Sequence, residues 1–197
     1  MMVAVSFAAG LNLYATTATL GLLARTNVLT LPPPLALLSN EWVIGASLLL
    51  FLVEFFADKI PVFDLVWNVL HTFVRIPAAA LLAWSTTSSL SPGGQFVAAV
   101  AGAALAFVAH GGKLAVRGAA TASPEPFSSV ILSLGEDAVA IGLTWFAAEY
   151  PYLAAAIVAV LVVVTFFLIR WTWRVMKVGG RRFRDRLTPP TAGTLTT

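Results

Sequence analysis

Long apolar stretches alternate along the chain with short clusters of proline, glycine and polar residues. Each stretch holds about 20 residues, which is the length of helix that crosses a bilayer. The clusters between them are typical of helix ends, since Leu31–Pro34 cannot continue a helix and Asn40 can cap the next one. The pattern predicts six membrane-spanning helices, at about residues 3–25, 42–60, 62–85, 95–117, 127–149 and 152–174.

The composition supports a protein that lies in lipid. Of the 197 residues, 59% are apolar and 11% are charged, and the mean hydropathy is +0.89, whereas a soluble domain carries about 25% charged residues. The chain has no cysteine, which excludes disulfides, thiolate nucleophiles and iron–sulfur clusters. We therefore expect an all-α membrane protein with one transmembrane domain over residues 1–177 and a disordered basic tail over residues 178–197.

Positive residues predict the orientation. They cluster after the last apolar stretch, which places the C-terminus in the cytoplasm. The loops at 26–41, 86–94 and 150–151 contain no Lys or Arg. With six spans, both termini are then expected to be cytoplasmic. The basic tail is interpreted as a topology anchor that touches anionic lipid, and no nucleic-acid partner is expected.

A weak internal repeat is present. The segment at residues 55–61 (FFADKIP) is similar to the segment at residues 145–151 (WFAAEYP), 90 positions later. The two halves, at about 3–85 and 95–174, would each hold three spans. An odd number of spans makes the halves inverted relative to each other, an arrangement in which transporters often place a site at the midplane.

Several ionisable and polar residues fall inside the predicted spans, where each ionisable group costs at least about 2.5–3.5 kcal/mol unless it has a partner or a function. Their spacing of three or four residues places them on one face of each helix. They are Glu54 and Asp58 in the second span, Asn68, His71 and Arg75 in the third, His110, Lys113 and Arg117 in the fourth, and Ser133, Glu136 and Asp137 in the fifth.

Acidic groups outnumber the deep basic groups, which disfavours an anion site. Carboxylate and imidazole groups suit a divalent ion such as Mn²⁺, Ca²⁺ or Mg²⁺, or protons alone. We predict a transporter or exchanger for a divalent cation, coupled to protons, and not an enzyme, with no covalent cofactor and the divalent cation as substrate. The predicted ion ligands or proton acceptors are Glu54, Asp58, Glu136 and Asp137, assisted by His71, His110, Asn68 and Ser133, with Arg75, Lys113 and Arg117 as counter-charges.

Two other functions fit the same residues. In a flippase or an intramembrane phosphotransferase, Arg75, His110, Lys113 and Arg117 would hold a lipid phosphate. In a membrane scaffold, the charges would only pair with each other, and the core would have no polar cavity. Small residues of the fourth span, such as Gly102 and Ala106, would allow tight helix packing or a homo-oligomer.

The charged motifs resemble those of a bacterial integral-membrane family known as domain of unknown function 4126, over roughly residues 8–165. The motifs are Glu54-x-x-x-Asp58-Lys59-Ile60-Pro61-x-x-Asp64, Leu70-His71-Thr72 with Arg75, His110-x-x-Lys113-x-x-x-Arg117, and Leu132-Ser133-Leu134-Gly135-Glu136-Asp137. The resemblance implies a multi-pass protein of the bacterial cytoplasmic (inner) membrane and gives no activity. The chain departs from the family pattern at Asn12 and Ser129, so the resemblance assigns these two positions no role.

A looser likeness is to cation exchangers of the lysine-exporter type, whose inverted halves carry E-x-G-D-K-[ST] motifs and exchange Mn²⁺ or Ca²⁺ for protons. The stretch from Glu54 to Lys59 has one residue too many for this motif and lacks its glycine. The likeness is an analogy that favours cation transport.

Overall fold

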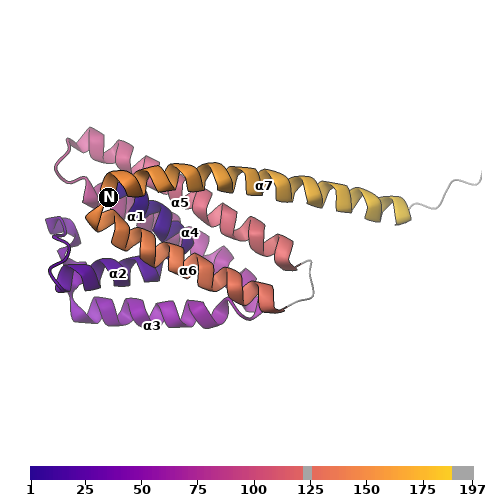
Figure 1. Ribbon diagram of the computed structural model, residues 1–197, viewed down its shortest axis with the longest axis horizontal. Coiled ribbons are helices and arrows are strands. Elements are labelled where there is room, and N and C mark those ends of the chain that lie inside the picture. The colour runs from indigo at the N-terminus through magenta and orange to yellow at the C-terminus, as the bar shows by residue number, and fades with distance from the viewer. Residues whose placement is uncertain (122–125, 188–197) are drawn as a thin grey trace, which may run out of the picture.

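The structure is a computed structural model that describes residues 1–121 and 126–187, and these residues contain helices but no strand (Figure 1). The prediction of an all-α protein is thereby confirmed. The elements in chain order are α1 (Met2–Leu11), α2 (Leu13–Arg25), the 3-10 helix η1 (Pro33–Ser39), α3 (Glu41–Ala57), α4 (Pro61–Thr86), α5 (Pro92–Thr121), α6 (Pro126–Glu149) and α7 (Pro151–Leu187).

Proline and asparagine define most of the helix starts. Four of the long helices begin at a proline, whose fixed φ angle and missing N–H suit the first helical position. The side chain of Asn40 accepts a hydrogen bond from the backbone N–H of Trp42 and so caps α3. Helix α7 extends to Leu187, past the predicted start of the tail at residue 178, and residues 188–197 lie outside the described part of the chain.

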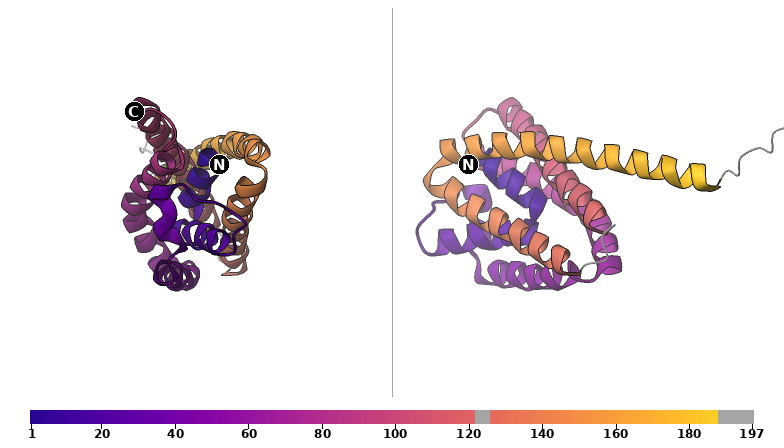
Figure 2. Two further views of the ribbon diagram at one scale, coloured as in Figure 1. Left: turned by 90° about the vertical axis from the view of Figure 1, so that its left-hand side faces the viewer. Right: turned by 45° about the vertical axis from the view of Figure 1, so that its right-hand side comes forward.

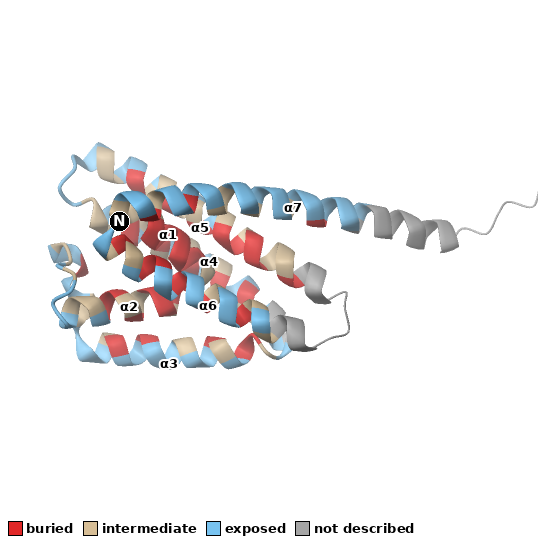
Figure 3. Cartoon of the chain, in the orientation of Figure 1, coloured by how far each residue is buried: buried red, intermediate tan, exposed pale blue. Residues whose placement is uncertain are grey.

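Four of the described helical segments are long and apolar enough to cross a membrane: Val66–Thr86, Pro92–Arg117, Val130–Glu149 and Pro151–Val175. The pair formed by η1 and α3, bent by 68°, meets the same test as a unit and gives a fifth candidate. The predicted sixth crossing is not confirmed. Buried residues gather on α1 and on the inner faces of the bundle, whereas most of the described side chains of α7 are exposed (Figure 3).

The first predicted span is not one helix. The chain breaks at Asn12, whose backbone is extended (φ −146°, ψ 105°). Its side chain accepts a hydrogen bond from the N–H of Ala15, at 2.9 Å, and so caps the start of α2. In a continuous helix, the N–H of Ala15 would donate to a backbone carbonyl of the preceding turn. The side chain of Asn12 replaces that acceptor, so the chain can change direction without leaving this N–H unpaired. The prediction of one helix over residues 3–25 is therefore wrong.

Helices α1 and α2 form a hairpin, which we call the N-terminal hairpin. Helix α1 runs parallel to α5, since Ser6 lies beside Gly102 and, further along both helices, Gly10 lies beside Ala106. Helix α2 runs antiparallel to α3, because Thr17 bonds to Ser47 whereas the later Gly21 lies beside the earlier Ile44. Helices α3 and α5 point the same way, so α1 enters the bundle and α2 leaves it at the same end (Figures 1 and 2).

The N-terminal hairpin affects the predicted location of the N-terminus. A helix of 10 residues such as α1 is about 15 Å long, roughly half the thickness of a hydrocarbon core. The start of α1 and the far end of α7 lie at opposite ends of the molecule (Figure 2). The structure therefore does not confirm that both termini lie on one side. The internal repeat stays a prediction, although α3 and α6 run in opposite directions, as an inverted repeat requires (Figure 1).

Helix α1 is the centre of the core. Seven of its ten residues are buried, and it packs against α4, α5, α6 and α7. The packing depends on small residues: a Cβ added at Gly10 would lie 2.6 Å from the Cα of Ala106, and one added at Gly102 would lie 2.5 Å from the Cβ of Ala83. The small residues of the fourth predicted span thus serve close packing within one chain.

Candidate functional site

The polar residues singled out from the sequence come together at the inner tip of the N-terminal hairpin. The acids come from the end of α3 and from α6, the bases from α4 and α5. All of them are buried except Glu136, which is partly exposed. The buried members are Glu54, Asp58, Asn68, His71, Arg75, His110, Lys113, Arg117, Ser133 and Asp137. The side chains of Asp64 and Ser129 lie outside the described part of the structure.

Lys113 on α5 is the hub of an ion-pair network. Its Nζ atom lies 3.3 Å from Oε1 of Glu54, 3.2 Å from Oδ2 of Asp58 and 3.4 Å from Oε2 of Glu136. Arg75 on α4 also donates to Oε1 of Glu54, and both of these side chains are fully buried. One ammonium group therefore contacts three carboxylates that come from two sides of the bundle.

Arg117 closes the network one helical turn further along α5. Its Nη2 atom lies 2.7 Å from Oδ2 of Asp58 and 2.7 Å from Oε2 of Glu136. Ser133 on α6 donates a hydrogen bond of 3.3 Å to the same oxygen of Asp58. The ion-pair network thus consists of three carboxylates (Glu54, Asp58, Glu136) and three basic groups (Arg75, Lys113, Arg117), and its charges balance.

Asp137 is the fourth carboxylate of the site and does not belong to the ion-pair network. Its Oδ1 atom accepts a hydrogen bond of 2.9 Å from the side-chain amide of Asn12, at the tip of the N-terminal hairpin. Asp137 is buried, it forms no ion pair within the described residues, and its Oδ2 atom has no hydrogen-bond partner among them. Four carboxylates face three basic groups, so the site holds one net negative charge when the histidines are neutral.

Asn12 was not among the site residues predicted from the sequence. Its position in the first apolar stretch, four residues before Thr16, is the only signal in the sequence, because the contact with Asp137 joins residues 125 positions apart. Asn12 is fully buried and its side chain has two roles. The side-chain oxygen Oδ1 caps α2, while the side-chain nitrogen Nδ2 donates to Asp137. It couples the fold of the hairpin to the charge on α6.

The hydrogen bonds of His110 define one neutral tautomer. Its Nδ1 atom lies 3.0 Å from Nη1 of Arg75, which can only donate, so Nδ1 must be the acceptor. The proton is then on Nε2, which donates to the hydroxyl of Thr72 at 2.7 Å, and this hydroxyl donates in turn to the carbonyl of Asn68. His110 therefore lies against the guanidinium as an uncharged group, with both of its nitrogens in use.

His71 is held in the opposite tautomer. Its Nδ1 atom lies 2.8 Å from the carbonyl oxygen of Trp67, which can only accept, so this nitrogen carries the proton. Its Nε2 atom then accepts from the hydroxyl of Tyr14, at 2.8 Å. The ring also stacks on Trp67, with 4.2 Å between centroids. Tyr14, on α2, is a second residue that the sequence analysis did not assign to the site.

The predicted metal ligands do not form a preformed metal cage. Within the described residues, no group of three or more His, Cys, Asp or Glu side chains is arranged to hold a metal ion. The carboxylates of Glu54, Asp58 and Glu136 instead converge on Lys113, and Asp137 points to Asn12. The metal site of these four acids remains a hypothesis that needs a change in the network.

A groove of about 430 Å³ borders the network. Helices α1, α5, α6 and α7 form its walls, and most of the lining side chains are apolar, such as Phe7, Ile131 and Leu168. Lys113 and Glu136 also line it.

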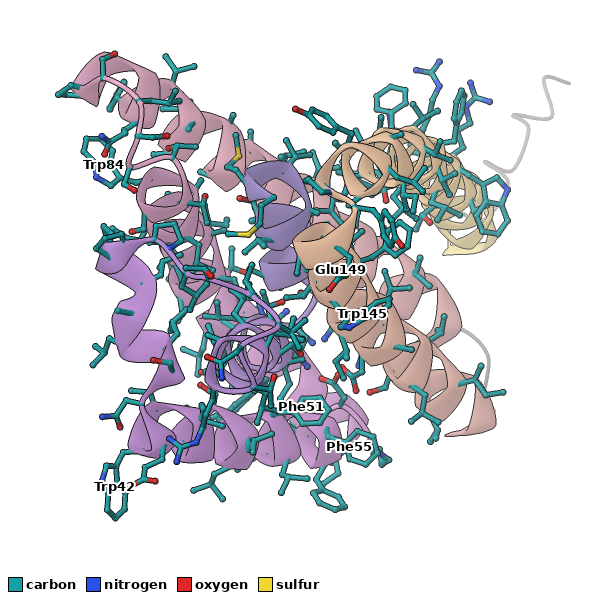
Figure 4. The ribbon with its side chains drawn as sticks, turned by 60° about the vertical axis from the view of Figure 1, so that its left-hand side comes forward. Trp42, Phe51, Phe55, Trp84, Trp145 and Glu149 are labelled. Atoms are coloured by element: carbon teal, nitrogen blue, oxygen red, sulfur yellow. The ribbon has the colours of Figure 1, made fainter. Side chains whose placement is uncertain are left out.

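The aromatic and acidic residues at the ends of the bundle do not belong to the site. Glu149 is the last residue of α6, and Trp42 at the start of α3 points away from the bundle (Figure 4).

The fold and the site together define an integral membrane helical protein with a buried ion-pair network. The family model described as "Domain of unknown function (DUF4126)" matches residues 1–171, and the chain belongs to this family. This confirms the resemblance found in the charged motifs; the likeness to lysine exporters is not shown. No curated protein and no solved structure matches the chain.

Proposed function

We propose that this chain is a membrane transporter that exchanges a small cation for protons. The observation that carries the proposal is Asp137, a buried carboxylate with a neutral partner beside a network whose other charges balance. A carboxylate without a counter-charge is costly in a low-dielectric interior. Binding of a proton or a cation at Asp137 removes this cost, which supports a role for it as the exchangeable site.

The neighbours of Asp137 suggest how occupancy could be coupled to movement. Glu136 precedes it on α6 and is paired with Lys113 and Arg117 on α5. Asn12 connects it to the tip of the N-terminal hairpin. A change of charge at Asp137 would therefore alter the contacts of α6 with both α5 and the hairpin. Such linkage between a buried charge and a helix contact is what an alternating-access carrier requires.

The remaining features of the proposal come from the sequence. Basic residues after the last apolar stretch favour a cytoplasmic end for α7, and the family resemblance favours the bacterial cytoplasmic membrane. Oxygen-rich acidic groups favour a divalent ion such as Mn²⁺, Ca²⁺ or Mg²⁺. The two inverted halves remain part of the proposal, and the N-terminal hairpin would enter the first half from the outer side.

Transport can be tested in proteoliposomes that contain a pH-sensitive dye. A gradient of the transported divalent cation should drive proton movement, and Asp137→Asn should reduce the rate by at least about tenfold because the exchangeable charge is lost. The matched control is Glu149→Gln, an exposed acid at the end of the same helix, and it should behave like the wild type. Absence of flux for every cation in a panel, or a D137N variant as active as the wild type, would refute the proposal.

A lipid-handling function is the second candidate, favoured by the apolar groove that reaches Lys113. Its predicted phosphate ligands are occupied, since Arg75, Lys113 and Arg117 bind carboxylates and His110 accepts from Arg75. This ranks it below cation transport. The same proteoliposomes, loaded with fluorescent phospholipid and treated with an impermeant quencher, distinguish the two: lipid movement without ion flux would favour the lipid function.

A further inference from the structure

We propose that the ammonium group of Lys113 occupies a cation site built from Glu54, Asp58 and Glu136, and that the transported cation binds by displacing it. The inference rests on the proposed function and adds the position of the substrate and the residue that competes with it. The structure then represents the state in which the ammonium group of Lys113 fills the cation site.

The geometry around Nζ of Lys113 is that of a bound cation. One oxygen from each of the three carboxylates lies within 3.2–3.4 Å of the nitrogen. An ammonium group is a compact point charge with three donors, and here it donates hydrogen bonds to Glu54 and Asp58 and forms an ion pair with Glu136. A metal ion is likewise attracted by converging carboxylate oxygens, and the shell would have to contract by roughly 0.6–1.1 Å per oxygen to reach the ligand distances of Ca²⁺.

The arginines would keep the carboxylates in place when the ammonium leaves. Arg75 remains bound to Glu54, while Arg117 bridges Asp58 and Glu136 at 2.7 Å to each. Because a guanidinium stays protonated and binds carboxylates as a rigid fork, these contacts fix the three acids independently of Lys113. The site would then lose the positive charge of Lys113, while its three carboxylates stay in place.

A second oxygen is available for a ligand. Oε2 of Glu54 has no hydrogen-bond partner within the described residues, although the side chain is fully buried. Buried carboxylate oxygens are normally satisfied, so an exception needs an explanation. A bound cation supplies one, because Glu54 could use both of its oxygens toward a metal while Arg75 still holds one of them.

The groove can accept the Lys113 side chain after its ammonium group leaves the carboxylates. Lys113 lines it, and the lysine stem is a flexible chain of four carbons that packs well along apolar walls. With the ammonium withdrawn, the three carboxylates of the cation site and the adjacent carboxylate of Asp137 face only Arg75 and Arg117, which leaves two negative charges in this region. That charge matches a divalent cation and not a monovalent one, so the substrate class is a divalent ion with a preference for oxygen ligands.

The substitution Lys113→Met tests the inference, because it keeps most of the stem and removes the competing charge. In detergent, Mn²⁺ binding measured by electron paramagnetic resonance should be at least about tenfold tighter than in the wild type, and Mn²⁺ should raise the melting temperature of the variant. Lys177→Met, on the exposed side of α7, is the control and should bind like the wild type. The double variant K113M/E136Q should lose the gain. Unchanged Mn²⁺ affinity in folded K113M would overturn the inference.

A measurement on the wild-type protein covers the case in which K113M does not fold. A small membrane-permeant amine reagent, followed by mass spectrometry, should modify Lys113 faster when Mn²⁺ is present, because the displaced ammonium moves into the groove. Modification of Lys177 should not change. A Lys113 rate that Mn²⁺ leaves unchanged would refute displacement even if the proteoliposomes transport cations. Conversely, tight Mn²⁺ binding to K113M without any flux would refute transport and leave the site standing.

Discussion

Replacing Arg75 by methionine should be one of the most destabilising single changes in this protein. The guanidinium is fully buried and donates to Glu54, to the ring of His110 at 3.0 Å and to Asn68 at 3.4 Å. Removing it leaves the buried carboxylate of Glu54 with only Lys113 as a counter-charge. Loss of one partner from a buried ion pair costs about 3–5 kcal/mol, which raises the unfolding equilibrium constant by between about two and about three and a half powers of ten.

The double variant Glu54→Met with Arg75→Met separates pairing from packing. It removes both charges and fills their space with apolar side chains, so it should be more stable than R75M alone, because no uncompensated carboxylate remains at that position. Together with the single variant Glu54→Met, the two variants complete a double-mutant cycle, in which we expect a coupling free energy of about 2 kcal/mol or more.

Equilibrium unfolding in mixed micelles, followed by tryptophan fluorescence, measures these free energies. The control is Arg25→Met, since Arg25 forms an exposed ion pair with Glu41 at 3.2 Å, and its loss should cost less than about 1 kcal/mol. If R75M is no less stable than R25M, or if the double variant loses the sum of the two single effects, Glu54 and Arg75 are not an energetically coupled buried pair.

Three further predictions concern the hairpin and the histidines. Gly10→Ala should lower the free energy of unfolding by about 1–3 kcal/mol, measured in the same micelles, because its Cβ would lie 2.6 Å from the α5 backbone. Asn12→Leu should cost at least about 1 kcal/mol through the lost cap of α2, and it should also impair transport, whereas Asn12→Asp should retain the cap. Nitrogen-15 spectra of labelled histidine should show the Nε2-protonated tautomer for His110 and the Nδ1-protonated one for His71; the reverse assignment would contradict the hydrogen bonds described.

Local signals in the sequence predicted most of the helices. Prolines and the Asn40 cap mark helix starts, and apolar length marks the segments that can cross a membrane. The three- and four-residue spacing of polar groups predicted that they share helix faces, and the structure brings those faces together around Lys113. These features depend on residues close to each other in the chain, which is why the pattern alone was sufficient.

The N-terminal hairpin could not be predicted in the same way. The first 23 residues contain no proline, and an asparagine inside an apolar stretch does not by itself distinguish one long helix from two short ones. The reversal at Asn12 is favoured by distant partners: α5, against which Gly10 packs, and Asp137 on α6. The specific pairings within the network likewise depend on the three-dimensional arrangement and not on spacing.

The hairpin also has a consequence for how the protein is made. Helix α1 leaves the ribosome long before α4, α5 and α6, yet it finds its packing partners in those later helices. An apolar segment that reaches only partway across the bilayer has little to hold it until they arrive. The earliest part of the chain is thus expected to be the last to settle, and in the proposed orientation the assembled bundle must admit it from the outer side.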